Sequence, residues 1–289
     1  MTKHAYLIIA HHEFELLQRL VTQLDDERND IYIHYDKKIV NLPKILVDRS
    51  TLYILDRRID VRWGDVSQIE SEFILFQEAY KKRPYVYYHT LSGVDFPLKN
   101  QNEIHRFFQL HQGKEFIGFS QGDLKEEIER KVKKYHLFPK YFKAKQKGML
   151  FHTAKIIRAF ALKMQVLFKV ERFKGVDLKK GTSWVSVTQD FVEFLLPHYT
   201  SVMKMYRKTY CADEIFLHTI CWNSPFREAI YDLGNERNGC QRMIGWQNGE
   251  LHDWTEKDFD ALVQSKCIFA RKFNSRNLGI VDKLTNNMK

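Results

Sequence analysis

The sequence predicts an α/β fold with a mixed, mainly parallel sheet flanked by helices, and three observations carry this prediction. Short apolar runs suited to buried strands occur at residues 5–10, 31–35, 51–55 and 85–91. Helical patterns separate several of these runs, as crossover connections between parallel strands require. No tract rich in Gly, Pro or Ser divides the 289 residues, so we expect one compact domain.

The elements of the first hundred residues follow in order. Strand 5–10 precedes a helix with leucines at 16, 17, 20 and 24, and strands 31–35 and 51–55 come next. Between Asp65 and Lys82 apolar residues recur at spacings of three and four, which predicts a helix with Asp65 as N-cap. Strand 85–91 completes this part.

Ligands of such folds gather at the carboxyl ends of the parallel strands. Four polar segments are expected to meet at that edge: Ala10-His11-His12, Asp36-Lys37-Lys38, Arg62-Trp63-Gly64 and Ser92-Gly93-Val94-Asp95. The two neighbouring histidines after a strand should point in different directions, and no third ligand stands at a recognisable spacing. We therefore expect backbone and hydrogen-bonding roles for them, and no metal site.

The middle of the chain, residues 123–180, is dense in Lys and Arg with interleaved Phe, Tyr, Leu and Met. One interpretation is a solvated helical face with ordinary packing. The other is a basic amphipathic surface that touches anionic lipid, where a lipid-linked acceptor would be found.

Regular structure returns after Gly181, with a strand at 184–187, a helix at 189–196 stopped by Pro197, and a helix beginning near Cys211. This last helix has Asp213 and Glu214 in its first turn, with His218 one turn beyond Glu214. Acids there complement the helix dipole and need no further purpose. They also suit catalysis, because a carboxylate at a helix N-terminus stays ionised and ready to accept a proton.

Many α/β transferases hold a divalent metal with an Asp-x-Asp pair after a central strand, but the matching place here offers only Asp95. The triplet Asp258-Phe259-Asp260 lies in a segment that predicts a capped amphipathic helix, so we interpret it as structural. A transferase that takes its donor group from a nucleoside diphosphate must stabilise the negative charge of the departing diphosphate. Without a metal, fixed cations must do this, and Arg271 with Lys272, after the apolar run 267–269, is a suitable source.

Composition narrows the class of protein. The net charge of +10 and the pI of about 9.2 fit nucleic acid, an anionic membrane surface or a phosphate-bearing substrate. No run approaches the roughly 20 apolar residues of a membrane span, and no signal peptide is evident. The four cysteines match no zinc or disulfide pattern, which favours reduced thiols in a cytoplasm. The glycine-rich phosphate loops of dehydrogenases and P-loop enzymes do not occur.

Taken in order, six segments resemble the core-2/I-branching β-1,6-N-acetylglucosaminyltransferase family, which includes the peptide O-xylosyltransferases. These are 5–11, 31–38, Arg62-Trp63-Gly64, Leu91-Ser92-Gly93-Val94-Asp95-Phe96-Pro97-Leu98-Lys99, Ala212-Asp213-Glu214 and Phe269-Ala270-Arg271-Lys272-Phe273. The similarity covers nearly the whole chain apart from the basic middle segment. It implies a GT-A-like fold without a functional Asp-x-Asp site, a UDP-sugar donor and inversion at the anomeric carbon, with no metal or other cofactor.

The resemblance also implies roles. Glu214 matches the catalytic base, Lys272 the cation that binds the diphosphate, Ala10 and His11 the loop around uridine, and Asp36 the acid that contacts the nucleoside. Further residues assigned to the donor are Arg62, Trp63 and Arg271. Residues assigned to the donor or acceptor sugar are Asp95, Trp184, Trp246 and His252.

Three departures shape the expected function. The family's second diphosphate-binding Arg is missing near residues 248–254, where His252 or Arg271 would substitute. Animal members of the family carry an N-terminal membrane anchor and several disulfides, which we do not expect here, so the chain resembles a bacterial, cytoplasm-facing member. The acceptor part also fails to match, and we expect an enzyme that extends a lipid-linked surface glycan, with UDP-GlcNAc as first donor. The predicted organisation is a nucleotide-binding half at about 1–122, a basic helical insertion at 123–180 and a catalytic and acceptor half at 181–289. The alternative is a nucleic-acid- or glycan-binding protein without activity.

Overall fold

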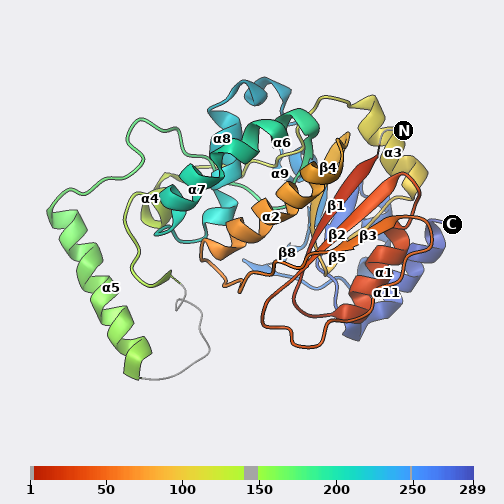
Figure 1. Ribbon diagram of the computed structural model, residues 1–289, viewed down its shortest axis with the longest axis horizontal. Helices are drawn as coiled ribbons and strands as arrows, with labels where there is room; N and C mark the ends of the chain where they lie inside the picture. Colours follow the sequence, from red (N-terminus) through yellow and green to blue (C-terminus); the bar gives the residue numbers. More distant parts are fainter. Residues whose placement is uncertain (1–2, 140–148, 248) are drawn as a thin grey trace.

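The computed structural model describes residues 3–139, 149–247 and 249–289, and for 150 and 151 the backbone alone (Figure 1). Its main sheet has five strands in the order β3-β2-β1-β4-β6. Their bounds are β1 His4–Ala10, β2 Asn29–Tyr35, β3 Thr51–Ile54, β4 Tyr87–Ser92 and β6 Ser186–Thr188. The first four strands are parallel and β6 is antiparallel to β4, which confirms the predicted mainly parallel α/β sheet.

The pairing register places the carboxyl ends of β1, β2 and β4 at the same edge of the sheet. Ala10, the last residue of β1, lies opposite Tyr35, the last residue of β2. On the other side of β1, Ile9 lies opposite Ser92 at the end of β4. The segments that follow these three strands therefore begin at the same edge of the sheet.

A smaller sheet lies beyond the end of β4. It consists of β5 Asp95–Pro97, β10 Phe269–Arg271 and β7 Arg242–Ile244, with β10 in the middle. A hairpin of β8 Trp246–Gln247 and β9 Glu250–Leu251 follows β7. The fully buried Arg242 joins the two sheets, because its Nη2 donates to the carbonyls of Val185 at 2.7 Å and Thr90 at 3.3 Å.

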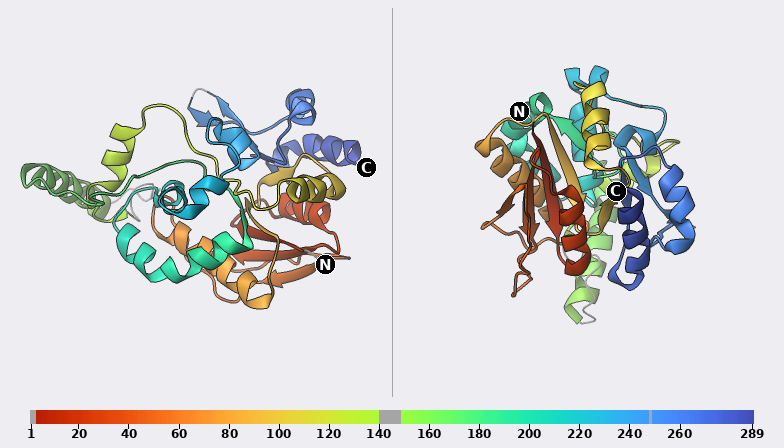
Figure 2. Two further views of the ribbon diagram at one scale, coloured as in Figure 1. Left: turned by 90° about the horizontal axis from the view of Figure 1, so that it is seen from above. Right: turned by 90° about the vertical axis from the view of Figure 1, so that its right-hand side faces the viewer.

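Helices cover both faces of the main sheet (Figures 1 and 2). Along β1, Tyr6 and Ile8 enter one core and Ala5 and Leu7 the other, as the two-residue period of a strand requires. The first core is closed by α1 Phe14–Leu24, α3 Gln101–Leu110, α10 Phe259–Gln264 and α11 Leu278–Asn287. The second is closed by α2 Ser67–Lys82, α6 Gln189–Leu195, α7 Tyr199–Tyr206 and α8 Phe216–Trp222, and the short α9 Glu236–Cys240 precedes β7.

The basic middle segment contributes two helices that differ in placement. Helix α4, Lys125–Val132, packs on the body, whereas α5, Met149–Leu167, projects from it (Figures 1 and 2) and contacts Tyr135 and His136, just after α4. Both lie at the end of the molecule toward which β1 runs. No helix within the described residues combines the length and apolar character of a membrane span.

One predicted helix end is confirmed and another is wrong. Helix α6 ends at Leu195, just before Pro197, and the path continues through a 3-10 turn, Leu196–His198, to α7. Proline is tolerated in the first turn of such an element, where its missing N–H has no partner to lose. Near Cys211 the expected helix start is a 3-10 turn, Ala212–Glu214, and α8 begins only at Phe216.

Candidate active site

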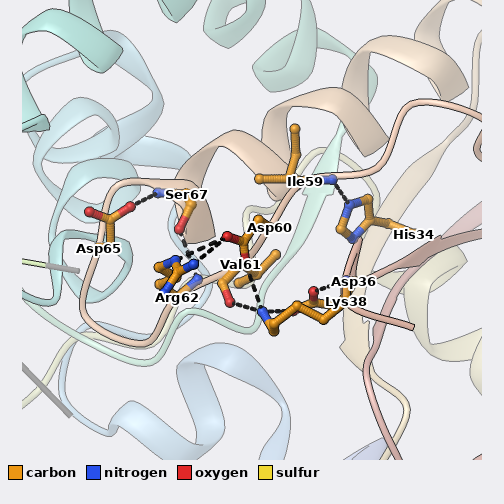
Figure 3. A network of polar contacts seen from close by, with 9 residues as sticks. All are labelled: His34, Asp36, Lys38, Ile59, Asp60, Val61, Arg62, Asp65 and Ser67. Atoms are coloured by element: carbon orange, nitrogen blue, oxygen red, sulfur yellow. Dashed lines mark hydrogen bonds and ion pairs between the residues drawn. The ribbon is translucent and has the colours of Figure 1, made fainter. Parts of the chain in front are cut away.

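The ends of β1 and β2 are tied together by Asp36. Its backbone N–H donates to the carbonyl of Ala10 at 2.9 Å, and its buried carboxylate accepts from the Lys38 backbone at 2.9 Å and from Lys38 Nζ at 2.6 Å. Lys38 Nζ continues to Asp60 at 3.0 Å and to the Val61 carbonyl at 2.6 Å (Figure 3). One lysine thus fixes the loop after β2 against the loop that precedes α2.

His11 and His12 follow β1 and are exposed at this edge. Their ring centroids are 4.1 Å apart, so the expectation that they point in different directions is wrong. Although its side chain is exposed on one side, partial desolvation lowers the pKa of His11, and the charge of His12 lowers it further. Asp36 opposes this shift, while Lys38 and Arg271 add to it.

The segment Arg62-Trp63-Gly64 lies against the segment that carries Glu214. Arg62 pairs with Asp60 at 2.6 Å, and the Trp63 ring meets the Tyr210 ring edge to face at 5.5 Å (Figure 3 for Arg62). Gly64 has φ +74° and packs so closely on Tyr210 that a Cβ would lie 2.7 Å from its ring. The Gly64 carbonyl accepts from the backbone N–H of Cys211 at 3.1 Å.

This contact explains why Glu214 does not lie in the first turn of an α-helix. Cys211 adopts the left-handed conformation with φ 49°. Ile215, at φ −128°, interrupts the helical conformation between the 3-10 turn and α8. His218 belongs to α8 and faces the core, where its Nε2 lies 3.0 Å from the Gly118 carbonyl. The ring is fully buried, and burial lowers its pKa to about 4.

Glu214 is half-exposed, and two lysines of the basic segment contact it. Lys131 Nζ lies 3.0 Å and Lys180 Nζ 3.6 Å from the same Glu214 oxygen, Oε2. Sequence analysis missed both lysines. The only signal was the spacing of Glu127 and Lys131 on one helical face, which predicts an ion pair within α4 and not one with a residue 83 positions away.

Asp213 is buried beside Glu214. Its Oδ2 accepts from Gln68 Nε2 and from Ser183 Oγ, both at 3.0 Å. Burial and then the Glu214 charge raise the pKa of Asp213 to about 6. Glu72 on α2 is also buried, and its pKa is raised by burial and by Asp213.

A cationic group stands at the end of β10. The Arg271 guanidinium lies over the Trp184 ring at 4.4 Å, and its Nη1 is 3.7 Å from Asp95 Oδ1. Burial lowers the pKa of Arg271 and raises that of Asp95, whose Oδ2 accepts from the Ser92 backbone at 2.9 Å. Nη1 of Arg271 is buried and has no hydrogen-bond partner among the described residues.

The remaining predicted residues lie around the hairpin. The Gly245 N–H donates to the Arg271 carbonyl at 3.1 Å, which holds the exposed Trp246 next to the end of β10. Lys272 Nζ lies 3.5 Å from Asp253 Oδ1. His252 Nε2 lies 3.3 Å from Asp258 Oδ2, so its side chain is directed to Asp258 and not to Arg271 or Lys272.

The Asp258-Phe259-Asp260 triplet caps a helix, as the sequence predicts. Asp258 Oδ2 accepts from the backbone N–H and the hydroxyl of Thr255, both at 2.9 Å, in a capping box. Among residues 3–139, 149–247 and 249–289, no three His, Cys, Asp or Glu side chains are grouped to hold a metal ion. The four cysteines are free and buried.

One short segment joins the acidic and the cationic part of the site. The Gly181 N–H donates to the Glu214 carbonyl at 2.9 Å, Ser183 binds Asp213, and Trp184 lies beneath Arg271. A carboxylate and a buried guanidinium thus flank one run of four residues, 181–184. This arrangement supplies a proton acceptor and an anion-binding group at the same edge of the sheet.

Known proteins resemble the chain along most of its length. A sequence model of the family described as Core-2/I-Branching enzyme matches residues 4–272. Xylosyltransferase 2 of Canis lupus familiaris is 25% identical over 294 residues, and that of Homo sapiens 24%, each covering 94% of this chain and 32% of the relative. The chain therefore spans about a third of the length of these relatives. A crystal structure of mouse xyloside xylosyltransferase 1, apo form, superposes with a TM-score of 0.39 and 10% identity, over 94% of this chain and 99% of that one.

Proposed function

The chain belongs to the Core-2/I-Branching enzyme family, and on this premise we propose that it transfers a sugar from a UDP-sugar to a hydroxyl of a glycan acceptor. The reaction inverts the anomeric carbon and uses side chains in place of a metal ion. The observation that carries this proposal is the single segment, 181–184, that contacts both the Glu214 turn and Arg271. The acid and the cation that a displacement needs are thereby held in one framework.

Glu214 is the proposed catalytic base. A carboxylate that is half-exposed on a turn fixed by Gly181 and Gly64 is accessible to an acceptor hydroxyl and has little freedom to move. As the acceptor oxygen attacks the anomeric carbon, its proton passes to Glu214, and the bond from that carbon to the diphosphate breaks with its electron pair on the departing UDP.

The donor is proposed to lie over the ends of β1, β2 and β10. Arg271, with a buried Nη1 that lacks a hydrogen-bond partner within the described residues, and Lys272 would neutralise the diphosphate. Ala10, His11 and Asp36 would surround the nucleoside, with Arg62 and Trp63 at its border. Asp95, Trp184 and Trp246 would line the sugar. Because His252 is engaged with Asp258, Arg271 is the better substitute for the family's second Arg.

UDP-GlcNAc follows from the family resemblance, and UDP-xylose from the xylosyltransferase relatives. The test measures thermal stabilisation by UDP, GDP, CDP and dTDP with Mg²⁺ or with EDTA, since binding to the native state raises the melting temperature. We expect a response to UDP alone that EDTA leaves unchanged. UDP release from the two UDP-sugars then follows, and strict dependence on Mn²⁺ or Mg²⁺ would overturn the metal-independent mechanism.

The role of Glu214 is tested with Glu214→Gln, and the exposed Glu228→Gln is the matched control. Removal of a general base should lower UDP release by about a hundredfold or more while UDP still stabilises the protein. Turnover by Glu214→Gln close to that of Glu228→Gln would exclude Glu214 as the base.

We propose further that the acceptor is lipid-linked and that α5 binds the cytoplasmic face of an anionic membrane. Met149, Ile156, Phe160 and Leu167 recur at spacings of seven, four and seven, which places them within about 40° around a helix of 100° per residue. They are 87, 70, 64 and 70% exposed. The helix thus carries a continuous apolar stripe directed away from the protein.

Two polar side chains on the opposite face of α5, Arg158 and Gln165, contact the body. The Gln165 amide pairs with the backbone of Tyr135, accepting at 2.7 Å and donating at 2.9 Å, and Arg158 contacts His136 at 3.4 Å. The sequence of α5 has Lys155, Arg158 and Lys163 and no Asp or Glu. An outward apolar stripe with basic flanks is complementary to anionic lipid, and α5 lies at the end of the molecule where the strand edge opens (Figures 1 and 2).

Co-sedimentation with vesicles of phosphatidylcholine, with and without phosphatidylglycerol, tests this surface. We expect binding to the anionic vesicles at low salt that weakens as salt screens the charge. No sedimentation at low salt would contradict the proposal, as would a dimer in solution that the substitution Ile156→Asp dissociates. Filter binding of oligonucleotides at physiological salt should be negligible, and clear binding would favour the nucleic-acid alternative.

A further inference from the structure

Glu214 belongs to a closed ring of four ion-paired side chains. Lys131 Nζ lies 2.7 Å from Glu127 Oε1 and 3.0 Å from Glu214 Oε2. Lys180 Nζ contacts the same two oxygens, at 3.0 and 3.6 Å. Two carboxylates and two ammonium groups thus alternate around the ring and balance in charge. Both ammonium groups contact the same oxygen of Glu214, Oε2.

The ring is fixed from three directions. Glu127 and Lys131 lie on α4, four residues apart on one face of the helix. The backbone of α4 is joined to the chain before Glu214, because Tyr210 N donates to the Lys131 carbonyl at 3.2 Å. Lys180 stands next to Gly181, whose N–H binds the Glu214 carbonyl. Movement of any one of these segments displaces the Glu214 carboxylate.

Without the lysines, Glu214 would face other acids. Asp213 is adjacent and buried, Glu127 lies across the ring, and Glu236 of α9 is close enough for its pKa to be raised by Glu214 after the larger effect of burial. Tyr210 and Cys211 also adjoin it, and burial raises the pKa of both, so neither carries charge at neutral pH. Lys131 and Lys180 therefore offset the repulsion between Glu214 and these three neighbouring carboxyl groups, Asp213, Glu127 and Glu236.

We infer that Lys131 and Lys180 are positioning residues that hold Glu214 by Oε2 and thereby present Oε1 to the acceptor hydroxyl. This inference rests on the proposed role of Glu214 as base. It assigns to two residues of the basic segment a task in the reaction, whereas sequence analysis placed that segment at the surface. An ammonium group beside a carboxylate favours the charged form, and a fixed oxygen orients the other.

The test compares Lys131→Met and Lys180→Met with Lys133→Met. Lys133 is the C-cap residue of α4 and pairs with Glu129 and Glu171, away from the ring. The readout is the pH profile of kcat/KM for UDP release from whichever of UDP-GlcNAc and UDP-xylose the wild-type protein turns over. We expect a loss of about tenfold at pH 7 and a shift of the acid limb toward higher pH by roughly one unit in both ring variants. Lys133→Met should match the wild type.

Further readouts separate positioning from folding and from the proposed function. Lys131→Arg should restore the acid limb, and UDP should stabilise every variant as it does the wild type. Lys180→Met carries the test if Lys131→Met does not fold. Unchanged acid limbs in the ring variants, together with an inactive Glu214→Gln, would overturn the inference and leave the base in place. An active Glu214→Gln would instead overturn the proposed function.

Discussion

Helices α4 and α5 come from one basic segment and use their lysines in opposite ways. In α4 and at its C-cap, the Lys131 and Lys133 ammonium groups lie within 3.1 Å of glutamates four residues earlier, and Lys131 also reaches Glu214. In α5 no acid is present, and the exposed apolar side chains form a stripe. Basic composition alone therefore does not define a binding surface. Where acids are interleaved with the lysines, as in α4, the positive charges are paired within the protein.

The largest predicted effect is a loss of vesicle binding when the apolar stripe of α5 is made charged. Combining Ile156→Asp with Phe160→Asp places two charges on side chains that are 70 and 64% exposed. Loss of two buried apolar groups at a membrane surface costs about 3 kcal/mol, or roughly a hundredfold in partitioning to anionic vesicles. The measurement is co-sedimentation, with Lys133→Met of α4 as control. Undiminished binding of the double variant would show that α5 is not the membrane-binding helix.

The sequence predicts the strands of the first half well because their signal is local. Apolar runs at 5–10, 31–35 and 85–91 coincide with β1, β2 and β4 within a few residues, and the polar segments after them meet at one edge. The family is also predicted and is confirmed by the match over residues 4–272. Both rest on patterns that a few consecutive residues carry.

The surroundings of Glu214 could not be predicted in the same way. The α-helical start is replaced by a 3-10 turn because Cys211 binds the Gly64 carbonyl and adopts a left-handed conformation. That contact spans 147 positions, and the one between Lys131 and Glu214 spans 83. No spacing rule reaches across such separations, so the residues around Glu214 emerge only from the fold.

A smaller predicted effect concerns the free energy of unfolding, which a substitution on α4 should lower more than one on α5. Lys131→Met leaves Glu127 and Glu214 with one cation between them, and the Lys131 side chain is only 10% exposed. We expect a loss of roughly 1–2 kcal/mol in the free energy of unfolding, less than for a fully buried pair because Glu214 is half-exposed. Ile156→Asp on α5 should change it by less than about 0.5 kcal/mol. Urea denaturation measures both, and equal losses would remove the distinction between the helices.

The next effect concerns single charges on α5. Lys163→Gln removes one positive charge beside the stripe, which should weaken binding to anionic vesicles by about 1 kcal/mol, or roughly fivefold at low salt. Lys133→Gln on α4 should leave vesicle binding unchanged, because Lys133 is already paired with Glu129 and Glu171. Titration with phosphatidylglycerol vesicles at two salt concentrations compares them. Equal weakening by both would mean that net charge, and not the α5 surface, drives binding.

The smallest effect is the pH dependence contributed by the ring on α4. Burial raises the pKa of Glu127, but hydrogen bonds and charges from Lys131 and Lys180 outweigh it, and the pKa is lowered overall. A carboxyl group whose pKa is lower in the folded state stabilises the protein above its unfolded pKa, and this contribution is lost as pH falls through the folded value. Glu127→Gln should therefore cost roughly 0.5 kcal/mol at pH 7 and nothing near pH 3. Glu126→Gln is the control, because Glu126 shares the first turn of α4 and hence the same helix dipole. A difference between the two variants that persists unchanged to pH 3 would mean that Glu127 acts through packing and not through its charge.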